Sequence, residues 1–273
     1  MNPDPRTEAS PARVADYYDR MAESWDQAHG AGRENARFAR QLRGSLKALL
    51  LQAPRTGVAL ELGAGTGPYL EVTAPLFSKL IASDLSAGML SVLGRRIAKL
   101  GLTNVTVLRQ DAYDLREIAP GSVDVVYSVG LLEIISDFGR LFAEIHRVLK
   151  PDGLVAGITS NGDCAWYRLR AVLQGGERHG RTGYFLNARD LDQFLRNAGF
   201  APPQITYWGA VPPNLQNPVL IGALAGAEAV IRGTPLARHL GVLSFTATKA
   251  DVPVGHKHLQ ERPGAASPGP KIA

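Results

Sequence analysis

An apolar run that leads directly into a glycine-rich turn constrains the fold of this chain more than any other feature. The buried strand predicted at 58–62 is followed by glycines at every second position, Gly63, Gly65 and Gly67. Glycine tolerates a positive φ and leaves no side chain in the way, so the turn can bring backbone N–H groups and a helix start close to a ligand. A tight turn that binds nothing would use the same residues.

The spacing of the glycines argues against a dinucleotide as that ligand. In the dinucleotide-binding fingerprint, the third glycine stands three positions after the second. Here Gly67 stands two positions after Gly65, and Pro68 follows it. Pyrophosphate binding is therefore disfavoured, and a nucleotide-dependent oxidoreductase becomes the weaker interpretation of the turn.

The rest of the chain alternates short apolar runs with helical patterns. The runs are rich in Val, Ile and Leu and lack polar alternation, which is typical of parallel strands covered by helices on both faces. Apolar residues recur at helical spacing at 89–100, 138–149 and 190–198. The pattern predicts an α/β fold with strands at 58–62, 80–83, 105–108, 123–128, 154–158, 204–208 and 243–248.

Acidic residues follow the next strands of this predicted sheet. Asp84 ends the second strand, where a carboxylate can accept hydrogen bonds from both hydroxyls of a ribose, and Asp111 comes shortly after the third. Open α/β sheets bind ligands at the carboxyl ends of their strands, so both acids stand at the expected edge. Each has a structural alternative, because Asp84 could cap the helix that begins near Ser86 and Asp111 could only form a turn.

The composition is that of a globular protein of a reducing compartment. Hydrophobic residues make up 45% and charged residues 20%, and the single cysteine, Cys164, cannot form an internal disulfide. The N-terminus carries no apolar segment of a signal peptide, so we expect a cytoplasmic protein. The net charge of +5 is mild and predicts a solvated surface, with no nucleic acid as partner. The histidines and the cysteine have no zinc spacing, so we expect no metal.

Together with the segments 122–129 and 143–153, these features resemble the class I S-adenosylmethionine-dependent methyltransferases. The resemblance covers residues 14–249. It implies a Rossmann-like fold, in which a mostly parallel seven-stranded sheet has helices on both faces and an added cap, and it implies S-adenosyl-L-methionine as the cofactor. The residues that it assigns to the cofactor site are Tyr17, Glu61, Gly63, Ala64, Gly65, Asp84, Leu85, Met89, Asp111, Ala112 and Ser128.

The same resemblance implies a role for most of these residues. The glycine turn would hold the methionine part of the cofactor, Glu61 would position its amino group, and Asp84 would bind its ribose. Leu85 and Met89 would pack against adenine, whose edge Asp111 and the N–H of Ala112 would read. For Met89, a position in the core is a serious alternative.

Residues 14–26 resemble the N-terminal helix of small-molecule methyltransferases similar to quinone-biosynthesis enzymes. In those relatives the helix closes over the cofactor, which places the hydroxyl of Tyr17 near the methionine end and Trp25 in the lid. Plain packing explains aromatic residues at this spacing equally well. Many of these relatives carry His where this chain has Ile134, so any polar role of that His is missing here.

The predicted function is methyl transfer to a small organic acceptor in a biosynthetic pathway, at oxygen, nitrogen or carbon. The donor has a good leaving group, so the protein must mainly position the acceptor and exclude water. If the acceptor is a hydroxyl, a base would help to remove its proton. The candidate bases are His29, Glu133, His179 and Tyr184, and none of them has a diagnostic spacing.

The alternative function is a catalytically silent scaffold of the same fold that only binds the cofactor. A nucleic-acid or protein substrate is disfavoured, because no Asn-Pro-Pro-Tyr type of motif follows the fourth strand. The acceptor and the oligomeric state stay open.

The predicted methyltransferase domain spans 14–249. Its apolar stretch at 219–231 is too short to cross a bilayer. A core helix is the favoured interpretation of that stretch, and a pocket wall or a weak peripheral membrane contact are the alternatives. Within this domain we expect N-terminal lid helices at 14–55 and substrate cap segments at 161–187 and 209–238. Outside it we expect a mobile N-terminus at 1–13 and a disordered tail at 250–273.

Overall fold

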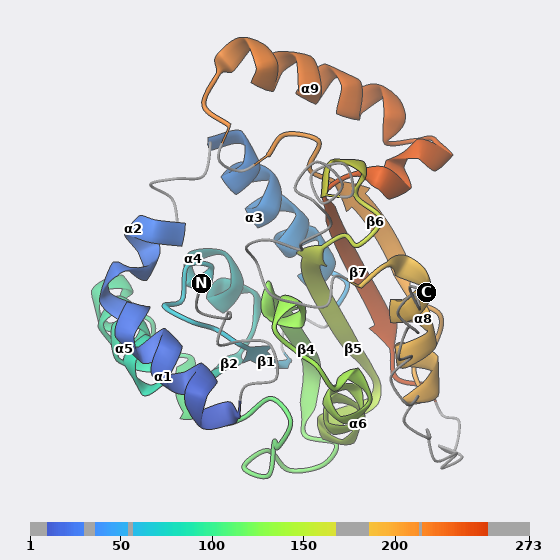
Figure 1. Cartoon of the computed structure of the whole chain (residues 1–273). Coiled ribbons are helices and arrows are strands. Elements are labelled where there is room, and N and C mark those ends of the chain that lie inside the picture. The colour runs from blue at the N-terminus through green and yellow to red at the C-terminus, as the bar shows by residue number, and fades with distance from the viewer. Residues whose placement is uncertain (1–9, 30–35, 54–56, 168–185, 213–214, 251–273) are drawn as a thin grey trace, which may run out of the picture.

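The computed structural model describes residues 10–29, 36–53, 57–167, 186–212 and 215–250. Its strands form one sheet in the order β3-β2-β1-β4-β5-β7-β6 (Figure 1). Neighbours from β3 to β5 are parallel, whereas β7 is antiparallel to both β5 and β6. The predicted mostly parallel, seven-stranded sheet is confirmed, with strands β1 (Val58–Leu62), β2 (Lys79–Asp84), β3 (Val105–Arg109), β4 (Val123–Val129), β5 (Leu149–Ser160), β6 (Gln204–Trp208) and β7 (Val242–Thr248).

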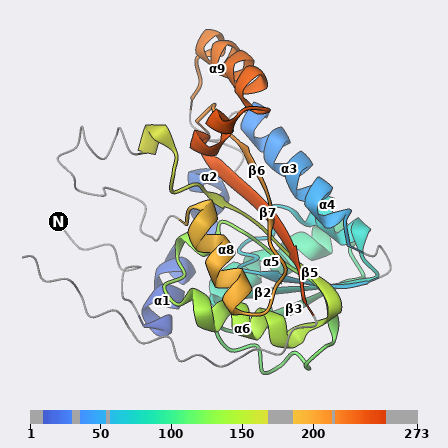
Figure 2. The same ribbon diagram turned by 90° about the vertical axis from the view of Figure 1, so that its right-hand side faces the viewer.

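Helices cover both faces of the sheet, because successive strand residues point to opposite sides. In β1, Leu60 belongs to the hydrophobic core beneath α6 and α8, and Ala59 to the core beneath α3, α4 and α5. Figure 2 shows these two groups of helices on opposite sides of the strands. The covering helices are α3 (Ala36–Leu50), α4 (Leu70–Thr73), α5 (Ala87–Leu100), α6 (Phe138–Val148) and α8 (Ala188–Asn197).

The helix α6 illustrates how local sequence sets these elements. It starts at an N-cap, where the side chain of Asp137 accepts a hydrogen bond of 2.9 Å from the N–H of Arg140. Apolar residues at helical spacing, such as Leu141 and Phe142, are buried against the sheet. The helix ends at Val148, shortly before the sequence Lys150-Pro151-Asp152-Gly153, which lies within β5.

The N-terminal helices differ from the predicted lid in two ways. The helix α1 (Pro11–Met21) already begins at Pro11, inside the segment expected to be mobile. Residues 36–50 form α3, whose Leu42, Leu46 and Leu49 are buried in the core of the sheet, so α3 is a covering helix and not a lid. The segments that lie apart from the sheet are α1, η1 (Ala22–Ser24) and α2 (Trp25–His29).

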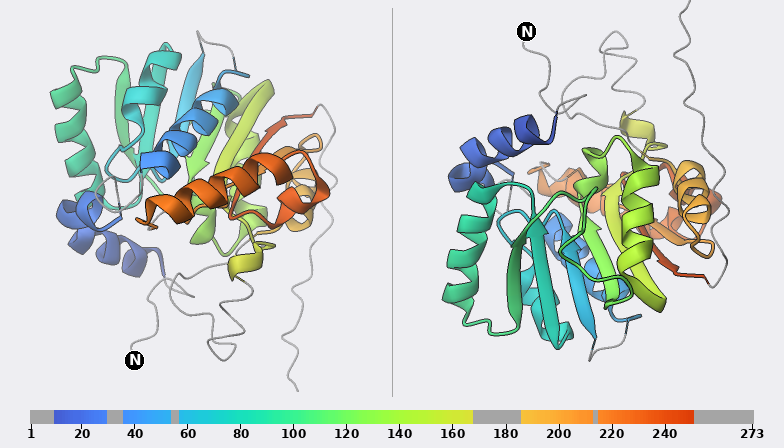
Figure 3. Two further views of the ribbon diagram at one scale, coloured as in Figure 1. Left: turned by 90° about the horizontal axis from the view of Figure 1, so that it is seen from above. Right: turned by 90° about the horizontal axis from the view of Figure 1, so that it is seen from below.

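The expectation of a core helix at 219–231 is wrong. The segment forms α9 (Pro218–Ile231), which lies at the outer end of the molecule above α3 (Figures 1 and 3). Val219 and Val230 are each 76% exposed, and only Glu228 is buried. None of the described helices is long and apolar enough to cross a membrane.

The close contact of β5 with β7 predicts that Gly157→Ala destabilises the fold. A Cβ at Gly157 would lie 2.4 Å from a ring carbon of Phe245, so the ring must shift, at a cost of about 1–3 kcal/mol. Urea unfolding measures this. The matched control is Gly94→Ala in α5, where a Cβ meets no atom within 4 Å and helix propensity favours Ala by about 0.5–1 kcal/mol. Equal effects of the two substitutions would contradict the prediction.

Candidate functional site

The main cavity lies at the carboxyl ends of β1, β2 and β4, the edge where the sequence placed its ligand. Its volume is about 1340 Å³. A single small-molecule pocket has roughly 300–1,000 Å³, so there is room for two ligands side by side. The walls come from the glycine turn, the N-terminal helices, α3, the loops after β2, β3 and β4, and the segments around α9.

The glycine turn combines a left-handed backbone, which glycine adopts readily, with open space. Gly63, Gly65 and Gly67 all have positive φ, at +68°, +55° and +75°. A Cβ at Gly63 would meet Leu131 and one at Gly67 would meet Leu93, so packing requires glycine there. A Cβ at Gly65 would meet no atom within 4 Å. Gly65 therefore leaves backbone open towards the cavity, where Gly63 and Ala64 also contribute to the wall.

Asp84 joins this turn to the start of α5. Its carboxylate accepts hydrogen bonds of 2.9 Å from the N–H of Gly65 and from the N–H of Ser86. Burial raises the pKa of Asp84, and these two N–H groups oppose that effect. Ser86 is the N-cap of α5, because its hydroxyl accepts a hydrogen bond from the N–H of Met89. Asp84 lines the cavity as well.

Two residues assigned to the cofactor from the sequence do not line the cavity, namely Glu61 and Ser128. Glu61 lies behind the turn, where its carboxylate accepts a hydrogen bond of 2.9 Å from the hydroxyl of the fully buried Tyr127. Burial raises the pKa of Glu61 from 4.5 to about 7. Their contact with a cofactor stays a prediction.

The loops after β2 and β3 and the first turn of α5 form a second part of the wall, with Leu85, Met89, Asp111 and Ala112. Asp111 also forms a turn, since its carboxylate accepts a hydrogen bond from the N–H of Tyr113 at 2.9 Å. The sequence analysis gave no role to Gln110, whose buried side-chain amide lines the cavity. Neither its oxygen nor its nitrogen has a hydrogen-bond partner among the described residues.

The N-terminal helices are held against α5 by acidic residues. Asp19 accepts hydrogen bonds from the hydroxyl of Ser86 and from the N–H of Gly88, and these bonds lower its pKa. Asp26 accepts from the hydroxyl of Thr66 at 2.6 Å and pairs with Arg96. The sequence analysis missed both acids, because nothing local marks their partners.

The aromatic residues of this N-terminal segment reach the cavity. Tyr17 and Trp25 line it, as the resemblance implied, together with Tyr18. The ring of Tyr18 packs edge-on against both, with ring centroids 5.2 Å from Tyr17 and 5.3 Å from Trp25. The segment therefore supplies both packing and cavity wall.

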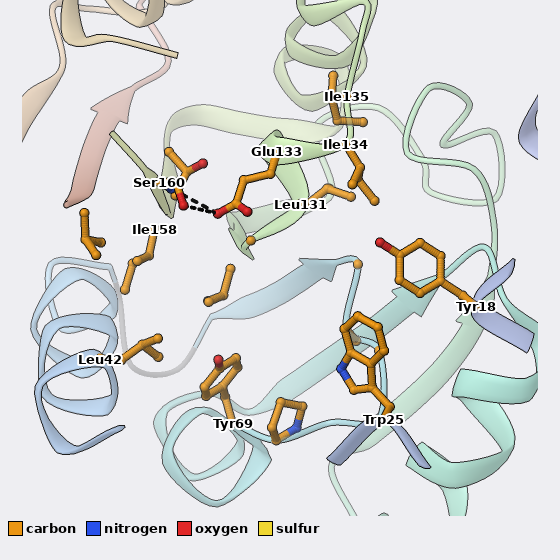
Figure 4. A pocket seen from close by; sticks show the side chains of 18 of the residues that line it. Tyr18, Trp25, Leu42, Tyr69, Leu131, Glu133, Ile134, Ile135, Ile158 and Ser160 are labelled. Carbon is orange, nitrogen blue, oxygen red and sulfur yellow. Dashed lines mark hydrogen bonds between the residues drawn. The ribbon is translucent and has the colours of Figure 1, made fainter. Parts of the chain in front are cut away.

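Glu133 is the candidate base that the structure places at the cavity. One carboxylate oxygen accepts hydrogen bonds from the N–H of Ser160 at 3.1 Å and from its hydroxyl at 2.7 Å. Figure 4 shows this pair facing a space whose other walls include Leu42, Tyr69 and Ile158. His179 and Tyr184 lie outside the described residues, as does the side chain of His29.

The predicted cap segments contribute to the apolar part of the wall. Trp166 and Tyr167 come from the first, whereas residues 168–185 lie outside the described part of the chain. Leu220 and Leu224 come from α9. His239, which the sequence analysis did not single out, also lines the cavity, next to a free and buried Cys164. Among the described residues, no group of three or more His, Cys, Asp or Glu side chains could hold a metal ion.

Comparison with known proteins identifies relatives of this chain. A family model described as a methyltransferase domain matches residues 60–157. Trans-aconitate 2-methyltransferase of Deinococcus radiodurans is 31% identical over 206 residues, which are 72% of this chain and 76% of that protein. Malonyl-(acyl-carrier protein) O-methyltransferase of Methylovorus sp. is 29% identical over 205 residues, or 70% of this chain. The match spans 64% of that relative's length.

A solved structure with the same fold is phosphoethanolamine N-methyltransferase 2 of Haemonchus contortus in complex with S-adenosyl-L-methionine. It superposes with a TM-score of 0.62 and 20% identity, over 91% of this chain and 62% of that one. At 20% sequence identity, this similarity is evidence for a shared fold alone.

The raised pKa of Glu61 predicts that the free energy of unfolding decreases between acid and neutral pH. The folded chain keeps a proton that the unfolded chain releases between pH 4.5 and about 7, so the free energy of unfolding falls as the pH rises through this window. The loss amounts to about 3 kcal/mol. We expect Glu61→Gln, which keeps an acceptor for Tyr127, to remove most of it. Urea unfolding of both proteins at about pH 5 and about pH 8, without donor, checks this. The same pH dependence in both would refute the assignment.

Proposed function

The chain belongs to the class I S-adenosylmethionine-dependent methyltransferases, and from this premise we propose that it methylates a small, largely apolar molecule at a hydroxyl group that meets Glu133. Its cofactor, S-adenosyl-L-methionine, supplies a methyl group on a sulfonium sulfur, which leaves as a neutral thioether. The observation that carries the proposal is the pair of Glu133 and Ser160 in an apolar wall of the cavity that also contains the glycine turn.

The residues around the glycine turn fit this cofactor. Gly65 leaves backbone open to the cavity, and Asp84 stands at the end of β2, where we assign it to the ribose hydroxyls. Leu85 offers apolar surface for adenine, and Met89, which is only 1% exposed, lies behind it as part of the core. The unpartnered amide of Gln110 offers a donor and an acceptor beside it, which is the kind of group that a buried heterocycle satisfies.

The other half of the cavity favours an acceptor with an apolar body. Its wall is formed mainly by apolar side chains from α3, β5, α9, the residues that follow η3 (Leu131–Glu133), and residues 215 and 240. Few polar groups interrupt that wall. In such pockets the polar groups fix the orientation of the ligand, and the apolar side chains cover most of its surface. The apolar residues are Phe38, Leu42, Ile134, Ile135, Ile158, Leu215, Leu220, Leu224 and Leu240.

Glu133 is suited to take the proton of a hydroxyl acceptor. Ser160 binds one carboxylate oxygen and holds the group in place, and Figure 4 shows the carboxylate at the cavity wall. The proton passes from the acceptor oxygen to this carboxylate as the new O–C bond forms. A carboxylate acceptor is the second candidate, because Arg43 also lines the cavity, although Glu133 would repel its charge.

Donor binding depends on Asp84 and Gly65 in this proposal. Asp84→Ala removes the group that holds the turn and binds the ribose, so we expect the affinity for S-adenosyl-L-methionine to fall by about 100-fold. Gly65→Val fills the open space and should abolish binding. Calorimetric titration measures both. The control is Asp114→Ala, a surface acid paired with Arg116. Binding as tight as in the unmodified chain, in both site variants, would overturn the donor site.

Acceptor turnover depends on Glu133. Incubating a metabolite extract with the chain and an isotopically labelled donor identifies the acceptor by mass spectrometry, and with it we expect Glu133→Gln to lower kcat by about 100-fold at neutral pH. Donor affinity should not change. Glu117→Gln, at an exposed acid, is the control. An unchanged kcat, together with a raised KM in Arg43→Gln, would favour the carboxylate acceptor. Donor binding without labelled product would favour the catalytically silent scaffold.

A further inference from the structure

The outer side of α9 is an apolar surface that the described part of the chain leaves uncovered. Residues exposed along the helix are apolar without exception, and its buried residue, Glu228, is directed to the protein. Leu236 of the following η4 (Pro235–His239) extends this surface and is 59% exposed. Exposed apolar surface of this kind marks a contact with another apolar partner. The exposed residues of α9 are Pro218, Val219, Leu220, Gly222, Ala223, Gly226, Ala227, Ala229 and Val230.

The orientation of α9 is fixed by Glu228. Its carboxylate accepts hydrogen bonds from the side chain of Gln41 on α3 at 2.5 Å and from the N–H of Ala210 at 3.0 Å, and it pairs with Arg232. Leu220 and Leu224 line the cavity. The helix therefore roofs the cavity with one side, and its other side must point away from the protein.

The charges around this surface are positive. From residue 35 to 60 the sequence has no acid, and from 193 to 250 its only acid is Glu228, which is 1% exposed. Arg37 and Arg40 lie exposed within one turn of Gln41, the point where α3 meets α9, and Arg232 is exposed at the end of α9. A basic rim around an apolar surface is complementary to an anionic lipid surface.

From this complementarity we propose that α9 and its arginine rim seat the chain on an anionic membrane surface. The helix lies in the interface and does not span it, because its 14 residues extend about 21 Å, less than the hydrocarbon core of a bilayer. Delivery of an apolar acceptor from the lipid into the cavity below is a consequence that also rests on the proposed function.

Vesicle sedimentation of the full chain tests the proposal without donor or acceptor. We expect binding to vesicles of phosphatidylcholine with about one third phosphatidylglycerol, and weaker binding to phosphatidylcholine alone or at high salt. Val219→Gln/Val230→Gln keeps the charge and should lower binding to the mixed vesicles by about tenfold or more. Arg37→Gln/Arg40→Gln should lower it and reduce its dependence on salt.

The control is Leu51→Gln/Val107→Gln, which removes two apolar residues of similar character, 39% and 37% exposed, away from α9. It should bind vesicles like the unmodified chain. No sedimentation with any vesicle, or equal loss in the control, would overturn the proposal. A dimer in lipid-free sedimentation velocity that Val219→Gln/Val230→Gln dissociates would assign the surface to a second copy instead. Calorimetric donor binding by the same variants separates this outcome from a failure of the methyltransferase site.

Discussion

The carboxylate of Asp84 is the interaction on which the site depends, because one side chain holds two backbone segments from neighbouring strands. It binds the N–H of Gly65 in the turn after β1 and the N–H of Ser86 at the start of α5. The three glycines of the turn have no side chains with which to define its shape, so this brace sets it together with the bond from Thr66 to Asp26. Ser86 in turn donates to Asp19, which ties α1 to the same point. The glycine turn, the start of α5 and the N-terminal helices thus share one anchor.

Most of the fold follows from patterns that act over short distances. Apolar runs without alternation correspond to the buried strands, and the position of Asp84 after such a run places it at the carboxyl edge whatever the rest of the chain does. The pairing of Asp19 and Asp26 with α5 could not be predicted in this way, because their partners lie about 70 residues away and any exposed acid looks alike in sequence. The same holds for Glu133, whose partner Ser160 comes from the next strand.

Glu61 shows what a correct strand assignment leaves open about the surroundings of a side chain. It pairs in register with Tyr127 of β4, and cross-strand neighbours point to the same face of a sheet. That face is covered by helices, so the carboxylate is buried and meets the tyrosine hydroxyl before it meets the cavity. Burial raises the pKa of Glu61, and a cation that reached the turn would lower this pKa again.

The exposed α9 follows from the same reasoning about buried charge. An apolar stretch predicts a core helix, but a carboxylate in its last turn can be buried only where several donors surround it. Burial alone would raise the pKa of Glu228, yet the donors from Gln41, Ala210 and Arg232 lower it. Gln41 lies in the first half of α3 and Ala210 follows β6, so satisfying Glu228 holds the helix beside these two segments. Its apolar outer side, with Val219 and Val230, is then left outside the core by one acid rather than by its own hydropathy.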